Sequence, residues 1–555
     1  MAATIARLVG GAGTGKTTEL LRLMELVIDR GIDPHNIGFV SFTRAARAEA
    51  STRAAERFGV TRKSLETSGW FRTLHSVCYR ALGVSSAQMV TDDRESAEWI
   101  ADVLQEPPLG KPPTGDDDAL GYVAPVEPSR CGVALTLWAA ARNRLCPVVD
   151  VWRDAVRCND TTPGLDYCRS IIDRYEQRKL LDNRIDFVDL LCMFAGVQCR
   201  VDGCETTRPL GDVPHVPVWF FDEQQDASAL LDRVCHRLIS HDACRWVYVV
   251  GDPFQAIYGW AGADSRLFRK WDAATERIMP KSYRCPDAVL RMGEDCIRDC
   301  SDYFDRKILP ADHGGTVDSV WGTGGMVSHL NPASERTVGI AVRTNYQLGI
   351  VARHLDENNI PWKPTRGHGG WSAPARSETI AAFVALQHGK PISWDAWGRC
   401  VNAMPARDMF RRGAKAENKR KASAMAEHHP DVKLWAEGLG HVGVTPAGLE
   451  TIQSGRWTAW VPKSDMWLAA AQRWGVDAVT RPRVNVGTVH SMKGAEFDDV
   501  YLNTAVSRPV VRSQSTPDGW DEERRVEYVG VTRARHRLVL VHQRGATAAM
   551  RLGVA

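Results

Sequence analysis

The chain has 555 residues, which is enough for roughly three or four domains with large buried cores. Its 44% hydrophobic and 25% charged residues are typical of a globular protein, and a net charge of +3 is too small to argue for nucleic-acid binding. The sequence has no apolar run of about eighteen residues, and a predicted strand begins almost at residue 1, so we expect neither a membrane span nor a signal peptide. Fourteen cysteines without a C-x-x-C pair are expected to be reduced, mostly buried thiols.

A phosphate-binding loop follows the first predicted strand. The apolar run IARLV precedes GGAGTGKTT, which fits the pattern G-x-x-x-x-G-K-[ST] from Gly10 to Thr17, and TTELLRLMELVI predicts a helix after it. Glycines let backbone N–H groups point at phosphate oxygens, and the helix start adds partial positive charge. We expect Lys16 to reach the terminal phosphates and Thr17 to bind Mg²⁺. The residues expected to bind ATP here are Gly10, Gly11, Ala12, Gly13, Thr14, Gly15, Lys16, Thr17 and Thr18.

Apolar, β-rich runs recur along the rest of the chain: NIGFVSFT, VPVWFF, WVYVV, TVGIAV, RVNVGTV, DVYLNTAV and RLVLV. Several are nearly continuous, which favours parallel strands covered on both faces. Helical patterns such as RAARAEASTRAAERF and IVARHLDENN lie between them, so the pattern predicts an α/β fold. Two stretches break the alternation, residues 86–184 and residues 376–477, and both are predicted to be insertions.

Polar residues follow two of the predicted strands. VPVWFF ends in Asp222 and Glu223, a pair suited to metal-assisted hydrolysis in which Asp222 holds Mg²⁺ and Glu223 activates water. The next strand leads into GDPFQAIYGWAGAD, where Gln255 is suited to sensing a γ-phosphate or orienting water. Tyr258 and Trp260 either belong to the core or form a stacking platform for the bases of a single strand.

Arg or Lys residues stand in three later segments, PKSYRCP, GTVHSMKGAEFDD and EERRVEYVGVTRAR. Added cations help to cleave a γ-phosphate, as arginine fingers do. If a second lobe delivers them, ATP lies at a lobe interface, and hydrolysis opens and closes the cleft.

In order and spacing, these motifs resemble those of the superfamily 1 UvrD/Rep-type DNA helicases. Matching segments run from residue 10 to residue 535: GGAGTGKTT, SFTRAARAEA, TLHSVCYR, RIDFVDLL, FFDEQQD, VGDPFQAIYGW, SYRCP, AVRTN, GTVHSMKGAEF and EERRVEYVGVTRAR. The resemblance implies an α/β fold with two RecA-like parallel-sheet lobes, each interrupted by a mostly helical accessory domain. The implied bounds are 1–85 with 185–280 for the first lobe, 86–184 for its insertion, 281–375 with 478–555 for the second lobe, and 376–477 for a reduced second insertion.

The resemblance also implies the cofactors ATP and Mg²⁺, with Thr17 and Asp222 as metal ligands. It assigns adenine stacking to Tyr283, a ribose contact to Glu496 and γ-phosphate contacts to Gln255 and Arg284, so that Tyr283, Arg284, Glu496 and Arg533 also belong to the implied ATP site. The implied catalytic residues are Lys16, Asp222, Glu223, Gln255, Arg284 and the second-lobe finger Arg533. The implied DNA contacts are Thr43, Arg44, His75, Tyr258, Trp260 and His490.

The chain departs from the family pattern at several positions. No Gln precedes Gly10, so adenine reading is expected to be looser or to depend on Tyr283 and apolar neighbours. Leu74 stands where the family often has a DNA-stacking Phe, and Gly259 replaces a frequent Arg. The short insertion 376–477 puts duplex engagement in question more than translocation.

The resemblance predicts an ATP-dependent DNA helicase or translocase that moves 3′ to 5′ on single-stranded DNA. We expect a monomer in a bacterial cytoplasm, or in that of a phage host, that binds single strands and single-strand/duplex junctions, with a protein partner in repair, replication or defence as an open possibility. The alternatives are a translocase that strips proteins without unwinding and an ATP-gated DNA-binding subunit of a nuclease or repair complex. A small-molecule kinase is disfavoured by length and by the later motifs. Residues 401–421 carry seven Lys/Arg against two Asp/Glu, so Arg411–Lys421 is either a duplex contact or a solvated helix.

Overall fold

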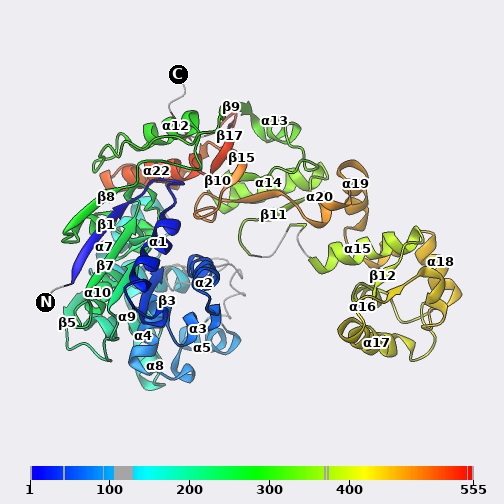
Figure 1. The fold of residues 1–555 in the computed structure, drawn as a ribbon, viewed down its shortest axis with the longest axis horizontal. Helices are drawn as coiled ribbons and strands as arrows, with labels where there is room; N and C mark the ends of the chain where they lie inside the picture. The colour runs from blue at the N-terminus through cyan, green and yellow to red at the C-terminus, as the bar shows by residue number, and fades with distance from the viewer. Residues whose placement is uncertain are drawn as a thin grey trace.

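The computed structural model of the protein describes residues 3–41, 44–91, 93–105, 129–159, 161–367, 370–371, 374–546 and 548–552. Two six-stranded parallel sheets form the framework of these residues (Figure 1). The first has the order β3-β2-β6-β7-β1-β8. Its strands are β1 (Thr4–Val9), β2 (Ile37–Ser41), β3 (Trp70–Thr73), β6 (Val218–Phe221), β7 (Trp246–Gly251) and β8 (Thr275–Ile278). Strands β2 and β6 are buried along their whole length, as their continuous apolar runs predict.

The second sheet has the order β11-β14-β10-β15-β17-β9, again with parallel neighbours. Its strands are β9 (Thr316–Trp321), β10 (Val338–Val342), β11 (Trp362–Pro364), β14 (Val484–Thr488), β15 (Phe497–Asn503) and β17 (Ala534–His542). The predicted α/β class with two parallel-sheet lobes is therefore confirmed. Strands β3, β8, β9 and β11 were not among the predicted strands, and β8 and β9 are largely exposed edge strands without a continuous apolar run.

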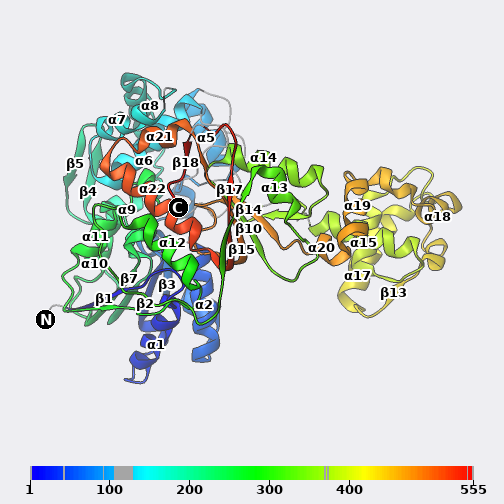
Figure 2. The same ribbon diagram turned by 90° about the horizontal axis from the view of Figure 1, so that it is seen from above.

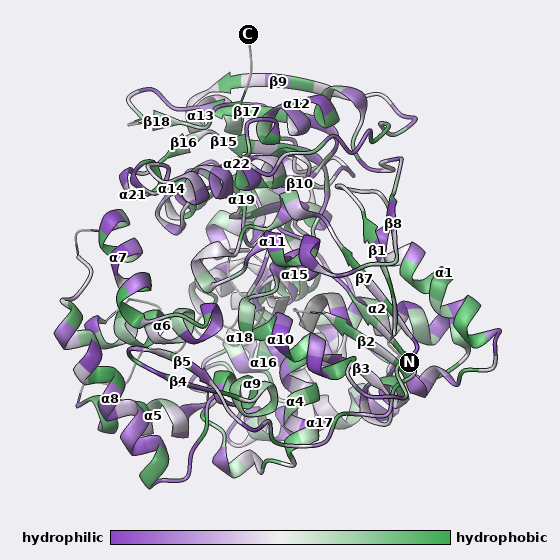
Figure 3. Cartoon of the chain, turned by 90° about the vertical axis from the view of Figure 1, so that its left-hand side faces the viewer, coloured by the Kyte–Doolittle hydropathy of each residue, from purple (hydrophilic) through white to green (hydrophobic). Residues whose placement is uncertain are grey.

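Helices cover both sheets. Those next to the first sheet are α1 (Lys16–Ile28), α2 (Arg44–Phe58), α3 (Arg62–Thr67), α4 (Leu74–Leu82), α9 (Phe187–Ala195), α10 (Ala229–Leu238) and α11 (Ser265–Lys270), with the 3₁₀-helices η1 (Pro34–Asn36), η2 (Ser86–Gln88), η4 (Gln224–Asp226), η5 (Pro253–Gln255) and η6 (Gly259–Ala261). Those next to the second are α12 (Asp287–Ile297), α13 (Gly322–Ser328), α14 (Asn345–Glu357), α21 (Arg508–Ser513) and α22 (Pro517–Val531). In Figure 3, α1 shows alternating green and purple bands, because Leu20, Leu21, Met24 and Val27 are buried while its polar residues face outward.

Two helical groups interrupt this alternation. The first comprises α5 (Arg94–Leu104), α6 (Arg130–Arg144), α7 (Val148–Cys158) and α8 (Leu165–Leu181), and it has a hydrophobic cluster of its own around Trp138 and Tyr175. The second lies between β11 and β14, which are hydrogen-bonded neighbours in the sheet. It comprises α15 (Pro374–Gln387), α16 (Trp394–Ala403), α17 (Ala414–His428), α18 (Pro446–Gln453), α19 (Ser464–Trp474), α20 (Val476–Thr480), the 3₁₀-helices η7 (Ala436–Gly440) and η8 (Arg456–Trp460), and the strand pair β12 (Ile392–Ser393) and β13 (Lys433–Leu434). Figures 1 and 2 both show α15 to α19 as a group at one end of the molecule.

One prediction about cysteines is wrong. Cys199 and Cys204 form a disulfide across the antiparallel pair β4 (Val197–Arg200) and β5 (Gly203–Thr206). The pair escaped prediction because the hairpin register, which sets the two residues opposite each other, was not recognised. The other twelve cysteines are free, and ten of them are buried, as expected.

Among the described helices, none has the length and apolarity that crossing a membrane requires. A last small strand pair joins β16 (Ala505–Val506) to β18 (Ala548–Ala549).

Candidate active site

The phosphate-binding loop connects β1 to α1. Gly13 and Gly15 have φ values of 69° and 80°, a left-handed conformation that glycine adopts without steric cost. A Cβ atom on Gly13 would lie 2.3 Å from the Cβ of Arg284, so only glycine fits between the loop and the segment that follows β8. The Lys16 ammonium donates to the carbonyl oxygens of Gly10 at 3.0 Å and Gly11 at 3.4 Å, which holds it over the loop.

The two carboxylates at the end of β6 lie beside this loop. Glu223 has a φ of 55°, a strained conformation for a residue with a side chain, and its backbone N–H donates to Asp222 Oδ1 at 3.0 Å. Burial raises the pKa of Asp222 to about 7, the charge of Glu223 adds to the rise, and Lys16 opposes it. Burial also disfavours the charge of Glu223, but Lys16 and then Lys493 outweigh it and lower its pKa. Glu223 is therefore ionised at neutral pH and able to accept a proton from water.

The donors here fit a magnesium ion. Thr17, on the first turn of α1, offers a hydroxyl and Asp222 offers a carboxylate, and both are the hard oxygen ligands that Mg²⁺ prefers. Asp222 is buried, and its raised pKa shows that nearby cations do not fully compensate its charge. A divalent cation would supply that compensation.

The second sheet contributes cations to the same place. Arg533 follows α22, is 1% exposed, and donates from Nη2 to Gln255 Oε1 at 3.4 Å. Lys493 donates to both oxygens of Asp226, at 2.6 and 2.5 Å, and to the Gln255 carbonyl oxygen at 2.5 Å. Arg533, like Lys16 and Lys493, lowers the pKa of Glu223. Lys16 and Arg533 thus act on one carboxylate.

Arg284 and Tyr283, in the segment that follows β8, lie against Gly13 and Gly15 of the phosphate-binding loop. Arg284 Nε donates to Glu496 Oε2 at 2.6 Å, and Arg535 also pairs with Glu496. Burial opposes the charge of Glu496, but Arg284 more than offsets this and lowers its pKa. Tyr283 is 69% exposed and would contact a Cβ atom on Gly15 at 3.8 Å, so its ring lies beside the loop, with the Lys281 ammonium 5.8 Å from the ring centre.

The residues expected to contact DNA differ in exposure. Trp260, on η6, is 49% exposed, whereas Tyr258 is buried with the Lys493 ammonium 4.9 Å from its ring centre. His490 is held by a hydrogen bond from Nε2 to the Ile257 carbonyl oxygen at 3.1 Å. Burial lowers the pKa of His490 to about 3, and the charge of Arg343 adds to the effect, so the imidazole is neutral.

Four further sequence positions remain, of which the structure places two. His75 on α4 is half-buried, with its ring centre 6.0 Å from that of Phe187, and Leu74 is buried in the core. Leu74 therefore offers no stacking surface. Thr43 and the side chain of Arg44 lie outside the described residues.

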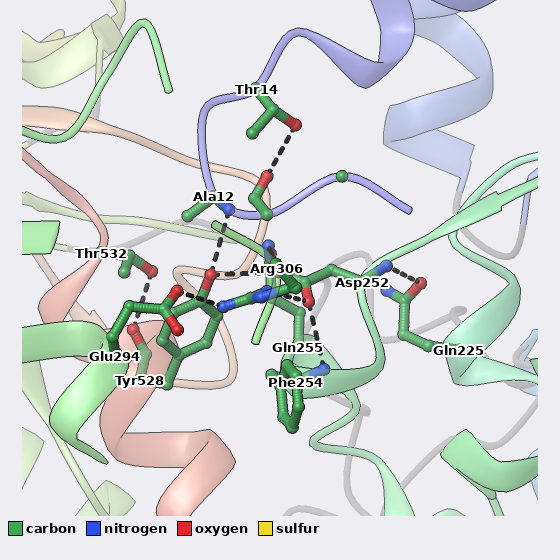
Figure 4. A network of polar contacts seen from close by, with 12 residues as sticks. Ala12, Thr14, Gln225, Asp252, Phe254, Gln255, Glu294, Arg306, Tyr528 and Thr532 are labelled. Atoms are coloured by element: carbon green, nitrogen blue, oxygen red, sulfur yellow. Dashed lines mark hydrogen bonds and ion pairs between the residues drawn. The ribbon is translucent and has the colours of Figure 1, made fainter. Parts of the chain in front are cut away.

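Sequence reasoning missed four residues of this site, three of which Figure 4 labels: Asp252, Arg306, Lys493 and Tyr528. Asp252 and Arg306 are completely buried, and Arg306 Nη1 donates a hydrogen bond to Asp252 Oδ1. Lys493 and Tyr528 lie inside segments already quoted for the family resemblance, so those segments were the available signal. Asp252 directly precedes Pro253 in the same quoted stretch as Gln255, while Arg306 has no comparable signal.

A basic pocket lies at the start of α17, in the helical group at one end of the molecule (Figure 1). It has a volume of about 670 Å³, and its cationic lining residues are Arg407, Arg411, Arg412, Lys415 and Lys419. Burial, and then the charge of Lys419, lower the pKa of Lys415. Part of the predicted basic stretch thus borders a concave surface that repels further cations and attracts anions.

Comparison with known proteins gives matches over most of the chain. The UvrD/REP helicase N-terminal domain model matches residues 3–105 and 142–275, and the UvrD-like helicase C-terminal domain model matches residues 468–545. The ATP-dependent DNA helicase PcrA of Bacillus subtilis is 23% identical over 642 residues, covering 97% of this chain and 81% of that protein. PcrA of Staphylococcus epidermidis is 22% identical over 387 residues, covering 65% of this chain and 49% of that protein. PcrA of Staphylococcus aureus is 22% identical over 387 residues, covering 65% of this chain and 48% of that protein.

Proposed function

Because the chain belongs to the superfamily 1 UvrD/Rep-type helicases, we propose that it is an ATP-driven motor that moves 3′ to 5′ on single-stranded DNA and separates duplex strands. The observation that carries the proposal is that Arg533, from the end of α22, donates to Gln255 Oε1 at 3.4 Å, while Arg533 and Lys16, from the loop after β1, both lower the pKa of Glu223. A triphosphate in the loop would be gripped from both sides. Closing the cleft would then favour hydrolysis, and hydrolysis would release the grip.

The geometry supports a role for each side chain in hydrolysis. The N–H groups of the loop and Lys16 would hold the β- and γ-phosphates. Glu223 would accept a proton from the attacking water, and Gln255 would orient that water. Arg533 and Arg284 would stabilise the charge that develops on the γ-phosphate. Thr17 and Asp222 would hold Mg²⁺, whose charge neutralises phosphate oxygens.

The same segment links this site to a DNA surface. Trp260 follows Gln255 by only five residues, so a shift of η5 at the nucleotide would move η6 and the exposed indole. His490 ties the segment after β14 to Ile257, between these two residues. Opening and closing of the cleft would therefore move a base-stacking side chain along a single strand.

We propose the domain bounds given by the family resemblance. Residues 1–85 with 185–280 contain every strand of the first sheet, and residues 281–375 with 478–555 contain every strand of the second among the described residues. The helical groups in 86–184 and 376–477 would be accessory domains. Single-strand/duplex junctions, action as a monomer, a cytoplasmic location and partners in repair, replication or defence stay predictions.

The proposal is tested with duplexes that carry either a 3′ or a 5′ single-stranded tail. The wild-type protein should hydrolyse ATP in response to single-stranded DNA and unwind only the 3′-tailed duplex. Lys16→Ala should abolish both activities, whereas Lys270→Ala, at an exposed position on α11, should leave them unchanged. Near-normal turnover in Lys16→Ala would refute the site, and unwinding of only the 5′-tailed duplex would refute the polarity.

A second assay separates the alternatives. Displacement of streptavidin from a biotinylated single strand without unwinding would indicate a stripping translocase. Co-purification with a nuclease would indicate an ATP-gated DNA-binding subunit instead, provided that the complex keeps its function when this chain carries Glu223→Gln.

A further inference from the structure

The carboxylate of Asp252 is held by donors from the other side of the cleft. Asp252 follows β7 of the first sheet, whereas Arg306 lies between α12 and β9, and Tyr528 belongs to α22. Arg306 Nη1 donates to Asp252 Oδ1 at 2.6 Å, and Tyr528 Oη donates to Asp252 Oδ2 at 3.2 Å (Figure 4). We propose that these three residues form an interlobe latch that couples closure of the cleft to the orientation of Gln255. The inference rests on the proposed ATPase function and makes Arg306 and Tyr528 positioning residues.

On the first-sheet side, Asp252 determines which way the Gln255 amide is turned. Asp252 Oδ2 accepts a hydrogen bond from Gln255 Nε2 at 2.7 Å, which leaves Gln255 Oε1 to accept from Arg533 at 3.4 Å. The Asp252 backbone N–H donates to Gln225 Oε1 at 3.0 Å, and Gln225 Nε2 donates to Glu223 Oε2 at 2.5 Å. Asp252 therefore connects the side chain suited to sensing the γ-phosphate with the carboxylate suited to activating water.

On the second-sheet side, Arg306 is fixed to α12. Its Nη2 donates to Glu294 Oε1 at 2.5 Å, and its guanidinium lies 4.7 Å from the ring centre of Phe254 and 5.2 Å from that of Tyr528. Arg306 and Asp252 are both completely buried, and buried charges are tolerated only when they are paired and hydrogen-bonded. The pair therefore persists only while the two sheets stay in this arrangement.

Tyr528 extends the latch to the phosphate-binding loop. Its hydroxyl accepts a hydrogen bond from the Ala12 backbone N–H at 3.1 Å while it donates to Asp252. Tyr528 lies within α22, and Arg533 follows the end of that helix by two residues. Docking of α22 would thus bring the latch and the arginine finger into place in one movement.

Tyr528→Phe tests the latch because it removes one hydroxyl and keeps the ring that packs in the core. Loss of its two hydrogen bonds should lower kcat of the DNA-stimulated ATPase by about tenfold, with the KM for ATP changed by less than about twofold. Tyr501→Phe is the matched control. Tyr501 is a buried tyrosine on β15 whose hydroxyl donates to the His329 carbonyl oxygen at 3.4 Å, outside the cleft. Both variants should remain fully folded at the assay temperature, which thermal unfolding measures.

A second measurement does not depend on turnover. In the nucleotide-free protein, backbone hydrogen exchange at Ala12 should be faster in Tyr528→Phe than in the wild type, and unchanged in Tyr501→Phe. A kcat equal to that of Tyr501→Phe, or unchanged exchange at Ala12, would overturn the latch. A wild-type protein without DNA-stimulated ATPase would instead overturn the proposed function, while the exchange experiment would still decide whether Tyr528 holds the loop.

Discussion

Replacing Arg533 by lysine tests whether its guanidinium, rather than its charge alone, serves the cleft. The side chain donates from Nε to the Val529 carbonyl oxygen at 2.9 Å and from Nη1 to the Ala495 carbonyl oxygen at 3.2 Å. Its Nη2 is shared between Gln255 Oε1 at 3.4 Å and Thr532 Oγ1 at 3.3 Å. Burial, and then the charge of Arg284, lower the pKa of Arg533 to about 10, so it stays charged at neutral pH.

The size of the effect follows from these contacts. Lysine keeps the charge, but one ammonium group cannot reach acceptors that lie in three directions around a planar fork. Losing about two charge-assisted hydrogen bonds of about 1.5 kcal/mol each costs about 3 kcal/mol, which corresponds to about a hundredfold in kcat. The KM for ATP should change far less, because the loop and Lys16 would bind most of the triphosphate.

The assay is phosphate release at saturating single-stranded DNA over a range of ATP concentrations, with thermal unfolding measured in parallel. Arg537→Lys is the matched control, because Arg537 lies on β17, pairs with Asp318 at 2.7 Å, and is outside the cleft. Its kcat should stay within about twofold of the wild type. If Arg533→Lys also kept more than about half of the wild-type kcat, the finger role would be refuted.

Three other experiments, with substitutions at four residues, test separate parts of the proposal. Because burial raises the pKa of Asp222 to about 7, the carboxyl is protonated below that pH and loses its capacity to bind Mg²⁺. The KM for Mg·ATP should therefore rise as the pH falls from about 8 to about 6, and Asp222→Asn should abolish this dependence in steady-state assays. Trp260→Ala should weaken single-strand binding by about tenfold in fluorescence anisotropy while ATP affinity is kept; equal loss of both would identify a core residue. Reversing the charges of Arg411 and Lys419 should reduce the salt dependence of duplex binding by about one unit of slope per charge or more, and an unchanged slope would rule out this contact.

The sequence alone determined the features that depend only on residues close together along the chain. Continuous apolar runs predicted the central strands of both sheets, and the spacing from Gly10 to Thr17 predicted a phosphate-binding loop between β1 and α1. Asp222 and Glu223 were recognised because a strand end fixes where such side chains emerge. Each of these signals spans only a few residues, so no knowledge of packing was needed.

Only the tertiary structure decided which residues meet. Tyr258 and Trp260 are two positions apart and look alike in the sequence, yet packing against Lys493 buries the first and leaves the second exposed. The latch joins Asp252 to partners 54 and 276 residues away. Such contacts depend on how two sheets pack against each other. No local pattern records that arrangement, because the partners are far apart in the sequence.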